Sequence, residues 1–134
     1  DGSYDPKAEA AAAIAVPEAH MVARNARDLD GLCSTNNYPH FRLSTAPEIV
    51  TWDDYDACYQ QEILNFIWFD YLNWGHSEWN LLEAVQVGEG KVHVKATYTR
   101  YDTDGEWMLT NDTLWIVVKR DGHWGVKFRS SFTQ

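Results

Sequence analysis

Few polar side chains in this chain are placed to move a proton, and His40 is the sharpest candidate among them. It follows Pro39 at the expected entrance to a strand, and an imidazole titrates near neutral pH, which suits a general base. A hydroxyl from Tyr98 or Tyr55 could donate to a developing oxyanion, and Arg100 could anchor charge. This set favours proton abstraction beside a carbonyl. The other interpretation of His40 is a structural residue bonded to a backbone carbonyl.

Asp112 is a further catalytic candidate, and its use depends on the register of the last hairpin. Asp121-Gly122 is a strong turn signal between two alternating runs. A two-residue turn would place Asn111 and Trp115 toward the inside of the sheet. A three-residue turn with a glycine bulge would place Asp112 and Leu114 there instead, because a slip of one residue exchanges the two faces. The sequence leaves both registers open.

Aromatic side chains are abundant enough to line a pocket for an apolar molecule. The chain has seven Trp, seven Tyr and five Phe, which suit either a packed core or the wall of a cavity. The aromatic run over residues 66–79 fits a core or a lid over a ligand. The residues expected to contact a substrate are Tyr55, Trp68, Trp74, Trp115 and Phe128.

Composition limits the classes of partner. Eleven Lys and Arg against twenty Asp and Glu give a formal net charge of −9, which argues against nucleic acid and anionic membrane surfaces. No apolar run approaches the roughly 20 residues that span a bilayer. The expected partner is therefore a small apolar or mixed-polarity molecule, with no nucleic acid and no membrane.

Motifs for metals and cofactors are missing. The five His show no spacing typical of a metal site, and His76-Ser77-Glu78 has no CxxC to complete a zinc site. Three of the others, His20, His93 and His123, are expected at the surface. No glycine-rich phosphate loop and no Gly-x-Ser-x-Gly nucleophile motif occurs. We expect no metal and no cofactor.

The two cysteines, Cys33 and Cys58, lie far apart in sequence within helical patterns and form no CxxC. We interpret them as buried free thiols in a reducing compartment, which predicts a cytoplasmic protein.

The elements that must position these residues are read from periodicity. Asp5-Pro6 predicts the start of a helix that Pro17 breaks, so that a second helical segment follows to about residue 32. Short strands are expected at 38–43 and 48–52, and then a helix. Four antiparallel strands follow at 79–87, 91–102, 106–119 and 123–132. This order predicts one α+β domain over residues 1–134, with the helices on one face of a curved sheet.

Alternation along the strands predicts which faces line the interior. On strand 91–102 one face grades from apolar to polar, as expected of a cone with a dry tip and a polar mouth. That face carries Val92, Val94, Ala96, Tyr98 and Arg100. On the last strand we expect Phe128 and its alternate neighbours inside, with Lys127, Arg129 and Ser131 outside. Strand 106–119 is apolar on both faces, which predicts a homodimer through the outer sheet face.

Several segments resemble proteins of the nuclear transport factor two-like superfamily, in particular SnoaL-like and ketosteroid-isomerase-like members. They are Asn25 to Asp28, Tyr38 to Arg42, Thr99 to Gly105, Lys119 to Trp124 and Arg129 to Phe132. The resemblance implies a cone-shaped α+β half barrel with N-terminal helices, a strongly curved sheet and an internal pocket.

On that scaffold the resemblance implies a small-molecule-binding protein. It could act as a cofactor-free isomerase, dehydratase or cyclase, with His40, Tyr98, Arg100 and Asp112 in the site. The alternatives are a ligand-binding module without turnover and an epoxide-hydrolase-like enzyme, since Arg100-Tyr101-Asp102 resembles the Arg-x-Asp of that group. The remaining alternative is a purely structural dimerisation domain.

Overall fold

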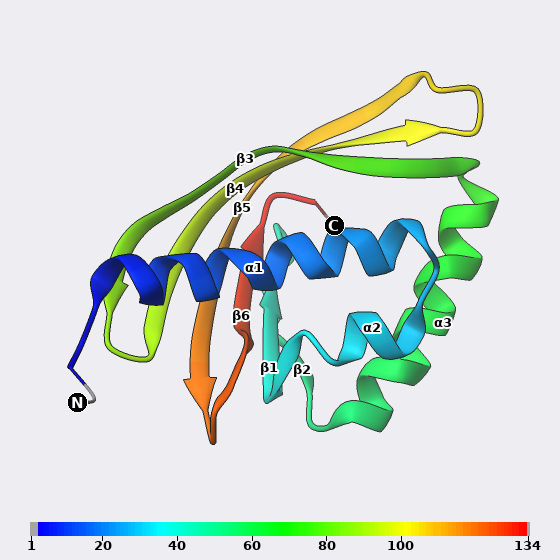
Figure 1. Ribbon diagram of the computed structural model, residues 1–134. Coiled ribbons are helices and arrows are strands. Elements are labelled where there is room, and N and C mark those ends of the chain that lie inside the picture. Colours follow the sequence, from blue (N-terminus) through cyan, green and yellow to red (C-terminus); the bar gives the residue numbers. More distant parts are fainter. Residues whose placement is uncertain (1–2, 134) are drawn as a thin grey trace.

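Six strands form one open sheet that curves around a long helix in the computed structural model, which describes residues 3–133 (Figure 1). The strand order is β2-β1-β6-β5-β4-β3, and every neighbouring pair is antiparallel except β1 and β6, which run parallel. The elements are α1 (Pro6–Asn25), α2 (Leu29–Cys33), β1 (Asn36–Leu43), β2 (Val50–Trp52), α3 (Tyr55–Tyr71), β3 (Trp74–Gly88), β4 (Lys91–Asp102), β5 (Trp107–Arg120) and β6 (His123–Ser131). The predicted α+β half barrel is confirmed.

Helix α1 is continuous, which corrects the predicted break at Pro17. Asp5 caps its start by accepting a hydrogen bond from the backbone N–H of Lys7, and Pro6 occupies the first turn. Pro17 has no N–H to donate, but its carbonyl accepts the indole N–H of Trp79 from the sheet at 2.9 Å. Helix α1 lies on the concave face of the sheet (Figure 1), and this contact with the sheet keeps the chain helical on both sides of Pro17. No helix within residues 3–133 has the length and hydropathy to cross a membrane.

The narrow end of the cone is a dry core, as the gradient along strand β4 predicts. Val92 and Val94 are fully buried there, and they pack with Trp115, Val117 and side chains from α1 and β6. Toward the other end of β4, the inward positions are Tyr98 and Arg100. This strand therefore leads from a packed tip to a polar interior.

The last hairpin has the two-residue turn. Arg120 pairs with His123, and both Asp121 and Gly122 have positive φ, at 51° and 78°. In this register Asn111 is buried and Asp112 is exposed. Of the two registers that the sequence left open, the structure has the one that turns Asp112 outward.

Strand β6 contains a β-bulge that overturns part of the predicted facing. Ile116 pairs with Phe128 and the next residue, Val117, pairs with Val126, so Lys127 is the extra residue in β6. Val126 lies inside as expected, but beyond the bulge the faces exchange. Phe128 therefore lies on the outer face beside Ile116. Arg129 and Ser131, which were expected outside, line the interior. The homodimer through the outer face stays a prediction.

Cys33 and Cys58 form a disulfide, so the prediction of free thiols is wrong. The bond joins the end of α2 to α3, with the two Cα atoms 5.9 Å apart, and both residues are fully buried. The predicted cytoplasmic location depended on reduced cysteines and loses that support.

Candidate functional site

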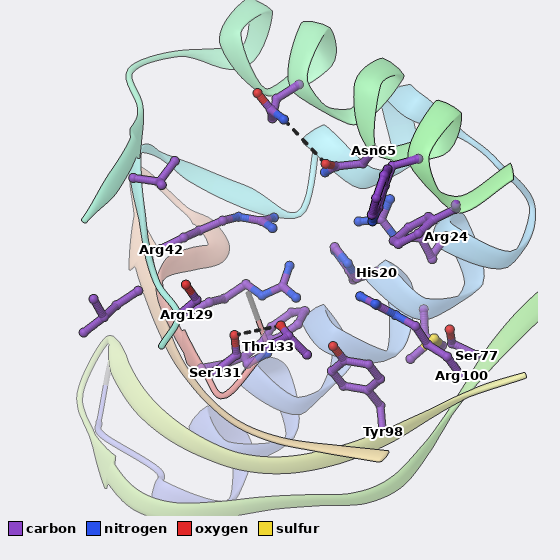
Figure 2. Close-up of a pocket in the computed structure, with 18 of the residues that line it drawn as sticks. His20, Arg24, Arg42, Asn65, Ser77, Tyr98, Arg100, Arg129, Ser131 and Thr133 are labelled. Carbon is purple, nitrogen blue, oxygen red and sulfur yellow. Dashed lines mark hydrogen bonds between the residues drawn. The ribbon is translucent and has the colours of Figure 1, made fainter. Parts of the chain in front are cut away.

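A cavity of about 410 Å³ opens between the inner face of the sheet and the side chains of α1 and α3 (Figure 2). Its lining comes from these two helices and from every strand of the sheet, together with residues that follow β1 and β6. Aromatic rings and polar groups share the walls. The polar groups labelled in Figure 2 include four arginines, one histidine and one tyrosine.

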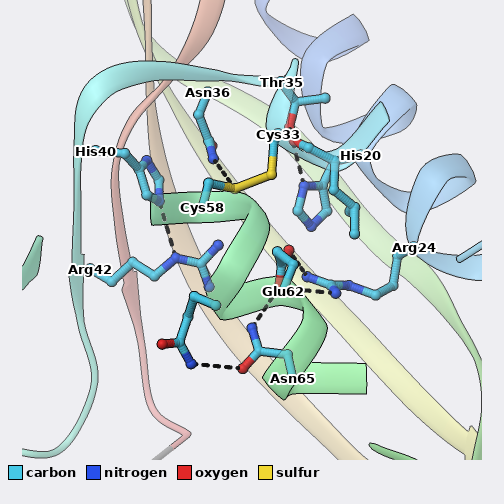
Figure 3. Close-up of polar contacts among 12 residues, drawn as sticks. His20, Arg24, Cys33, Thr35, Asn36, His40, Arg42, Cys58, Glu62 and Asn65 are labelled. Atoms are coloured by element: carbon cyan, nitrogen blue, oxygen red, sulfur yellow. Dashed lines mark hydrogen bonds and ion pairs between the residues drawn. A yellow bond between two sulfur atoms is a disulfide. The ribbon is translucent and has the colours of Figure 1, made fainter. Parts of the chain in front are cut away.

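Arg24 is the lining arginine with a carboxylate partner. Its Nη1 and Nη2 atoms donate to the two carboxylate oxygens of Glu62 at 3.2 and 2.7 Å, and Glu62 is 1% exposed (Figure 3). Asn65 Nδ2 also donates to Glu62. Burial by itself raises the pKa of Glu62, but the guanidinium groups of Arg24 and Arg42 outweigh burial and hold that pKa below its ordinary value. The carboxylate is therefore ionised in the folded protein.

Arg42 and Arg129 enter the cavity with unpaired donors. The Arg42 guanidinium lies over the Trp52 ring, 3.8 Å from its centroid, and that of Arg129 lies 4.4 Å from the centroid of Trp115. Within residues 3–133, Nη2 of Arg42, Nη1 of Arg129 and Nε1 of Trp115 are buried and have no hydrogen-bond partner. These three nitrogen atoms are covered in the walls of the cavity, and no group of the described residues accepts a hydrogen bond from them.

Burial acts against the charge of these arginines. It lowers the pKa of Arg42 well below its ordinary value, and the nearby Arg129 adds to the effect. Burial likewise lowers the pKa of Arg129 to about 10 and lowers that of Arg100. At a pKa of about 10, Arg129 remains a cation at neutral pH.

His20 is the histidine in the cavity, although the sequence placed it at the surface. Thr35 Oγ1 donates to the carbonyl of Leu32 at 2.6 Å, so it accepts from His20 Nδ1 at 3.3 Å. That assignment leaves a lone pair on Nε2 of a ring that lines the cavity. Burial, and then the cationic Arg129 and Arg24, hold the pKa of His20 well below its ordinary value. The ring is neutral, and its Nε2 atom can accept a hydrogen bond.

Tyr98 can act as the complementary donor. Its hydroxyl oxygen accepts from Asn111 Nδ2 at 3.1 Å, which leaves the phenolic proton free for another partner. Tyr98 is 6% exposed and lines the same cavity as His20. One acceptor and one donor therefore share the cavity.

His40 does not line the cavity, contrary to the expected acid–base role. Its Nδ1 atom donates to the carbonyl of Val126 at 2.9 Å, and its Nε2 atom accepts from Nε of Arg42 at 3.1 Å (Figure 3). Burial, reinforced by Arg42, lowers the pKa of His40 to about 2. Both ring nitrogens are used, so His40 is a structural residue that orients Arg42.

The structure gathers some of the other predicted residues and separates the rest. Tyr98, Arg100, Trp68 and Trp115 line the cavity. Trp74 lies beside it, where its indole donates to Ser77 Oγ at 2.9 Å. Three predicted residues lie elsewhere. The exposed hydroxyl of Tyr55 donates to Asp30, and this bond raises the pKa of Tyr55 to about 12. Asp112 accepts a hydrogen bond from Thr97 on the outer face of the sheet, and Phe128 also lies on that face. Asp102 accepts two backbone N–H groups of its own turn at 2.9 Å, which removes support for an epoxide-hydrolase-like relay.

Comparison with known proteins identifies the fold. A ketosteroid isomerase-like protein from Erwinia carotovora atroseptica is similar, with a TM-score of 0.70 and 16% identity over 92% of this chain and 95% of that chain. An NTF2-like protein with a cystatin-like fold from Novosphingobium aromaticivorans has a TM-score of 0.76 and 6% identity, over 94% and 82%. The protein Aln2 from a Streptomyces species has a TM-score of 0.72 and 14% identity, over 96% and 92%.

These likenesses confirm the nuclear transport factor two-like fold that the resemblance in sequence implies. At these identities they establish the fold alone. No family model matches the chain, and no curated protein matches its sequence.

Proposed function

We propose that this protein binds a small molecule of mixed polarity inside the cone. The observation that carries the proposal is the cavity of about 410 Å³, whose walls combine aromatic rings with polar groups directed inward. Ligand pockets in proteins typically measure about 300–1,000 Å³ and combine an apolar lining with a few placed polar groups. Trp52, Trp79 and Phe69 supply rings for an apolar body, and Tyr98 supplies a hydroxyl donor.

Filling the cavity is expected to abolish binding. Ser131 lines the cavity, whereas its neighbour Ser130 lies on the outer face opposite Leu114. A thermal-shift screen of aromatic ketones, acids and amides should give compounds that stabilise the wild type and the matched variant Ser130→Trp. The same compounds should not stabilise Ser131→Trp, because the indole would occupy their space. Equal stabilisation of both variants would place the binding site outside the cavity, and a screen without any ligand would count against the proposal.

Acid–base catalysis is the second candidate function, and the His20–Tyr98 arrangement favours it. A neutral imidazole with a free Nε2 could remove a proton from carbon, while the Tyr98 hydroxyl donates to the oxygen on which charge develops. The chemistry would need no cofactor. Glu62 is not available as the base, since Arg24 and Asn65 already hold its carboxylate.

Replacing His20 by Gln is expected to remove any such activity. The probe is 2-tetralone, an enolisable ketone, and the measurement is the exchange of its α-protons in D₂O by NMR. Exchange above the buffer rate in wild type should fall about 10²- to 10⁴-fold in His20→Gln, which is the usual contribution of a general base. The control is His93→Gln, on the outer face of β4. Exchange at the buffer rate in wild type would leave ligand binding as the function.

A further inference from the structure

We propose that the ligand of this cavity is an organic acid whose carboxylate lies between Arg42 and Arg129, with its apolar body against the aromatic walls. The inference rests on the binding function proposed above and names the chemical class of the ligand. It is carried by three features of the cavity: its charge, its unpaired donors and the orientation of its guanidinium groups (Figure 2).

The charge of the cavity is opposite to the charge of the protein. The chain as a whole has a formal charge of −9. Among the residues that line the cavity there are four arginines and no Asp or Glu: Arg24, Arg42, Arg100 and Arg129. Glu62 lies behind the lining and is engaged by Arg24. Three guanidinium groups in this enclosed space therefore lack a carboxylate of the described chain as partner.

Three buried donors in the cavity walls have no acceptor among the described residues. A buried N–H without a partner costs free energy, and the cost is greater when the group is charged. Nη2 of Arg42, Nη1 of Arg129 and Nε1 of Trp115 are three such donors among residues 3–133, and all three belong to the walls of one cavity. Arg42 and Arg129 are themselves only half-buried and line the cavity, so a small shift of either side chain would bring its unpaired N–H to a ligand. A neutral ligand would then accept a hydrogen bond, but only an anion would also neutralise the neighbouring cations.

The orientation of the two guanidinium groups favours a planar anion. Each lies over an indole ring, Arg42 over Trp52 and Arg129 over Trp115, so the aromatic ring covers one flat face. The N–H groups of a guanidinium point outward in its plane, and they match a carboxylate with two parallel hydrogen bonds. His40 fixes Arg42 further by accepting from its Nε atom. This arrangement holds Arg42 in place for an in-plane acceptor.

A structural role for Arg129 predicts a different behaviour. The side chain of Arg129 makes no hydrogen bond or ion pair within residues 3–133, and burial opposes its charge. Its removal should therefore leave the unliganded protein as stable as before or make it more stable. Replacement of an arginine that stabilises the fold would instead lower the melting temperature of the unliganded protein. This difference separates a ligand-binding arginine from a structural one.

The experiment compares 2-naphthoate with its neutral analogue 2-naphthamide by isothermal titration calorimetry and thermal shift. The proteins are wild type, Arg129→Met and the matched control Arg120→Met, which removes the same charge at the exposed end of β5. Wild type and Arg120→Met should bind the carboxylate more tightly than the amide. Arg129→Met should lose about 10- to 100-fold in carboxylate affinity with little change for the amide, as expected for lost charged hydrogen bonds. Its unliganded melting temperature should not fall.

Other outcomes separate the two proposals. Equal affinity for the carboxylate and the amide, or unchanged carboxylate affinity in Arg129→Met, would overturn the organic-acid assignment and leave the binding function standing. If neither naphthalene compound binds and the broader ligand screen is also negative, the binding function fails with it. Inorganic phosphate and sulfate are run in parallel, and tighter binding of these ions than of the carboxylate would reassign the site to tetrahedral anions. If Arg129→Met does not fold, Arg129→Lys takes its place, with weaker carboxylate binding expected because lysine lacks the planar fork.

Discussion

Replacing Glu62 by Gln is expected to lower the free energy of unfolding by about 3–5 kcal/mol, the usual cost of removing one partner from a buried ion pair. Glu62 is 1% exposed, and its carboxylate accepts both Nη atoms of Arg24. Glutamine has nearly the same shape but no charge, so Arg24 would stay buried among the other cavity arginines without a counter-ion. The measurement is urea unfolding followed by tryptophan fluorescence.

The control for this prediction is the exposed ion pair between Arg27 and Asp70, in which the two side chains are 44% and 61% exposed. Asp70→Asn should change the free energy of unfolding by no more than about 1 kcal/mol, because water screens an exposed pair. Similar losses of unfolding free energy in Glu62→Gln and Asp70→Asn would contradict the prediction, because the buried Arg24–Glu62 pair would then contribute no more to stability than the exposed pair. The double variant Glu62→Met with Arg24→Met should recover part of the stability, since it removes both charges.

Acidification is the second large effect expected. His20 and His40 are buried and neutral, and burial is the first cause that lowers the pKa of each. Below the unfolded pKa of about 6.5, the unfolded chain takes up a proton on each histidine that the folded protein does not. Stability therefore falls as the pH falls, by about 1.4 kcal/mol per pH unit for each histidine, and for His40 this continues to a pH of about 2.

Between pH 6.5 and 5 His40 should remove about 2 kcal/mol of unfolding free energy, and His20 adds a further loss in the same direction. The lowered pKa of Glu62 adds a loss in the same direction at lower pH, so this range isolates the histidines. The measurement is urea unfolding at pH 7.5, 6 and 5 for wild type, His20→Gln and His40→Gln. Each variant should show a shallower pH dependence, and His93→Gln should keep the wild-type slope. Wild-type slopes in both buried-site variants would contradict the prediction.

Much of the fold could be predicted from the sequence because strand alternation and turn signals are local. The change from apolar to polar side chains between Val92 and Arg100 could be predicted from the alternation of strand residues alone. The Asp121-Gly122 turn limited the pairing of the last two strands to two possible registers. The bulge at Lys127 could not be predicted in the same way. It depends on how β6 pairs with both β5 and β1, which are non-local contacts. Arg129 was assigned to the wrong face for this reason above all.

Helix α1 shows a second limit. The buried face runs through Ala13, Val16, His20 and Ala23, whereas Ala19, Val22 and Ala26, which also lie at helical spacing, are exposed. In an alanine-rich helix several stripes have similar hydrophobicity, so the sequence does not select one. Two steps of four residues from Val16 lead to His20 and Arg24, which both lie on the buried face.

Pairs that form across the fold were the third limit. Cys33 and Cys58 are separated by 25 residues, and nothing in that spacing indicates that α2 and α3 bring their sulfurs together. The Arg24–Glu62 pair is likewise made between α1 and α3. Sequence indicates which residue types could pair, and packing decides which do.

The bulge in β6 decides which side chains this wall of the cavity presents. Because successive strand residues face opposite ways, a β6 strand in which Lys127 paired regularly with β5 would turn Phe128 and Ser130 inward and Arg129 outward. The cavity wall would then exchange a cation for a phenyl ring although the amino-acid sequence stayed the same. A protein of this fold that lacks the extra residue would keep the present facing, because the pairs on either side of Lys127 are already consecutive in β5.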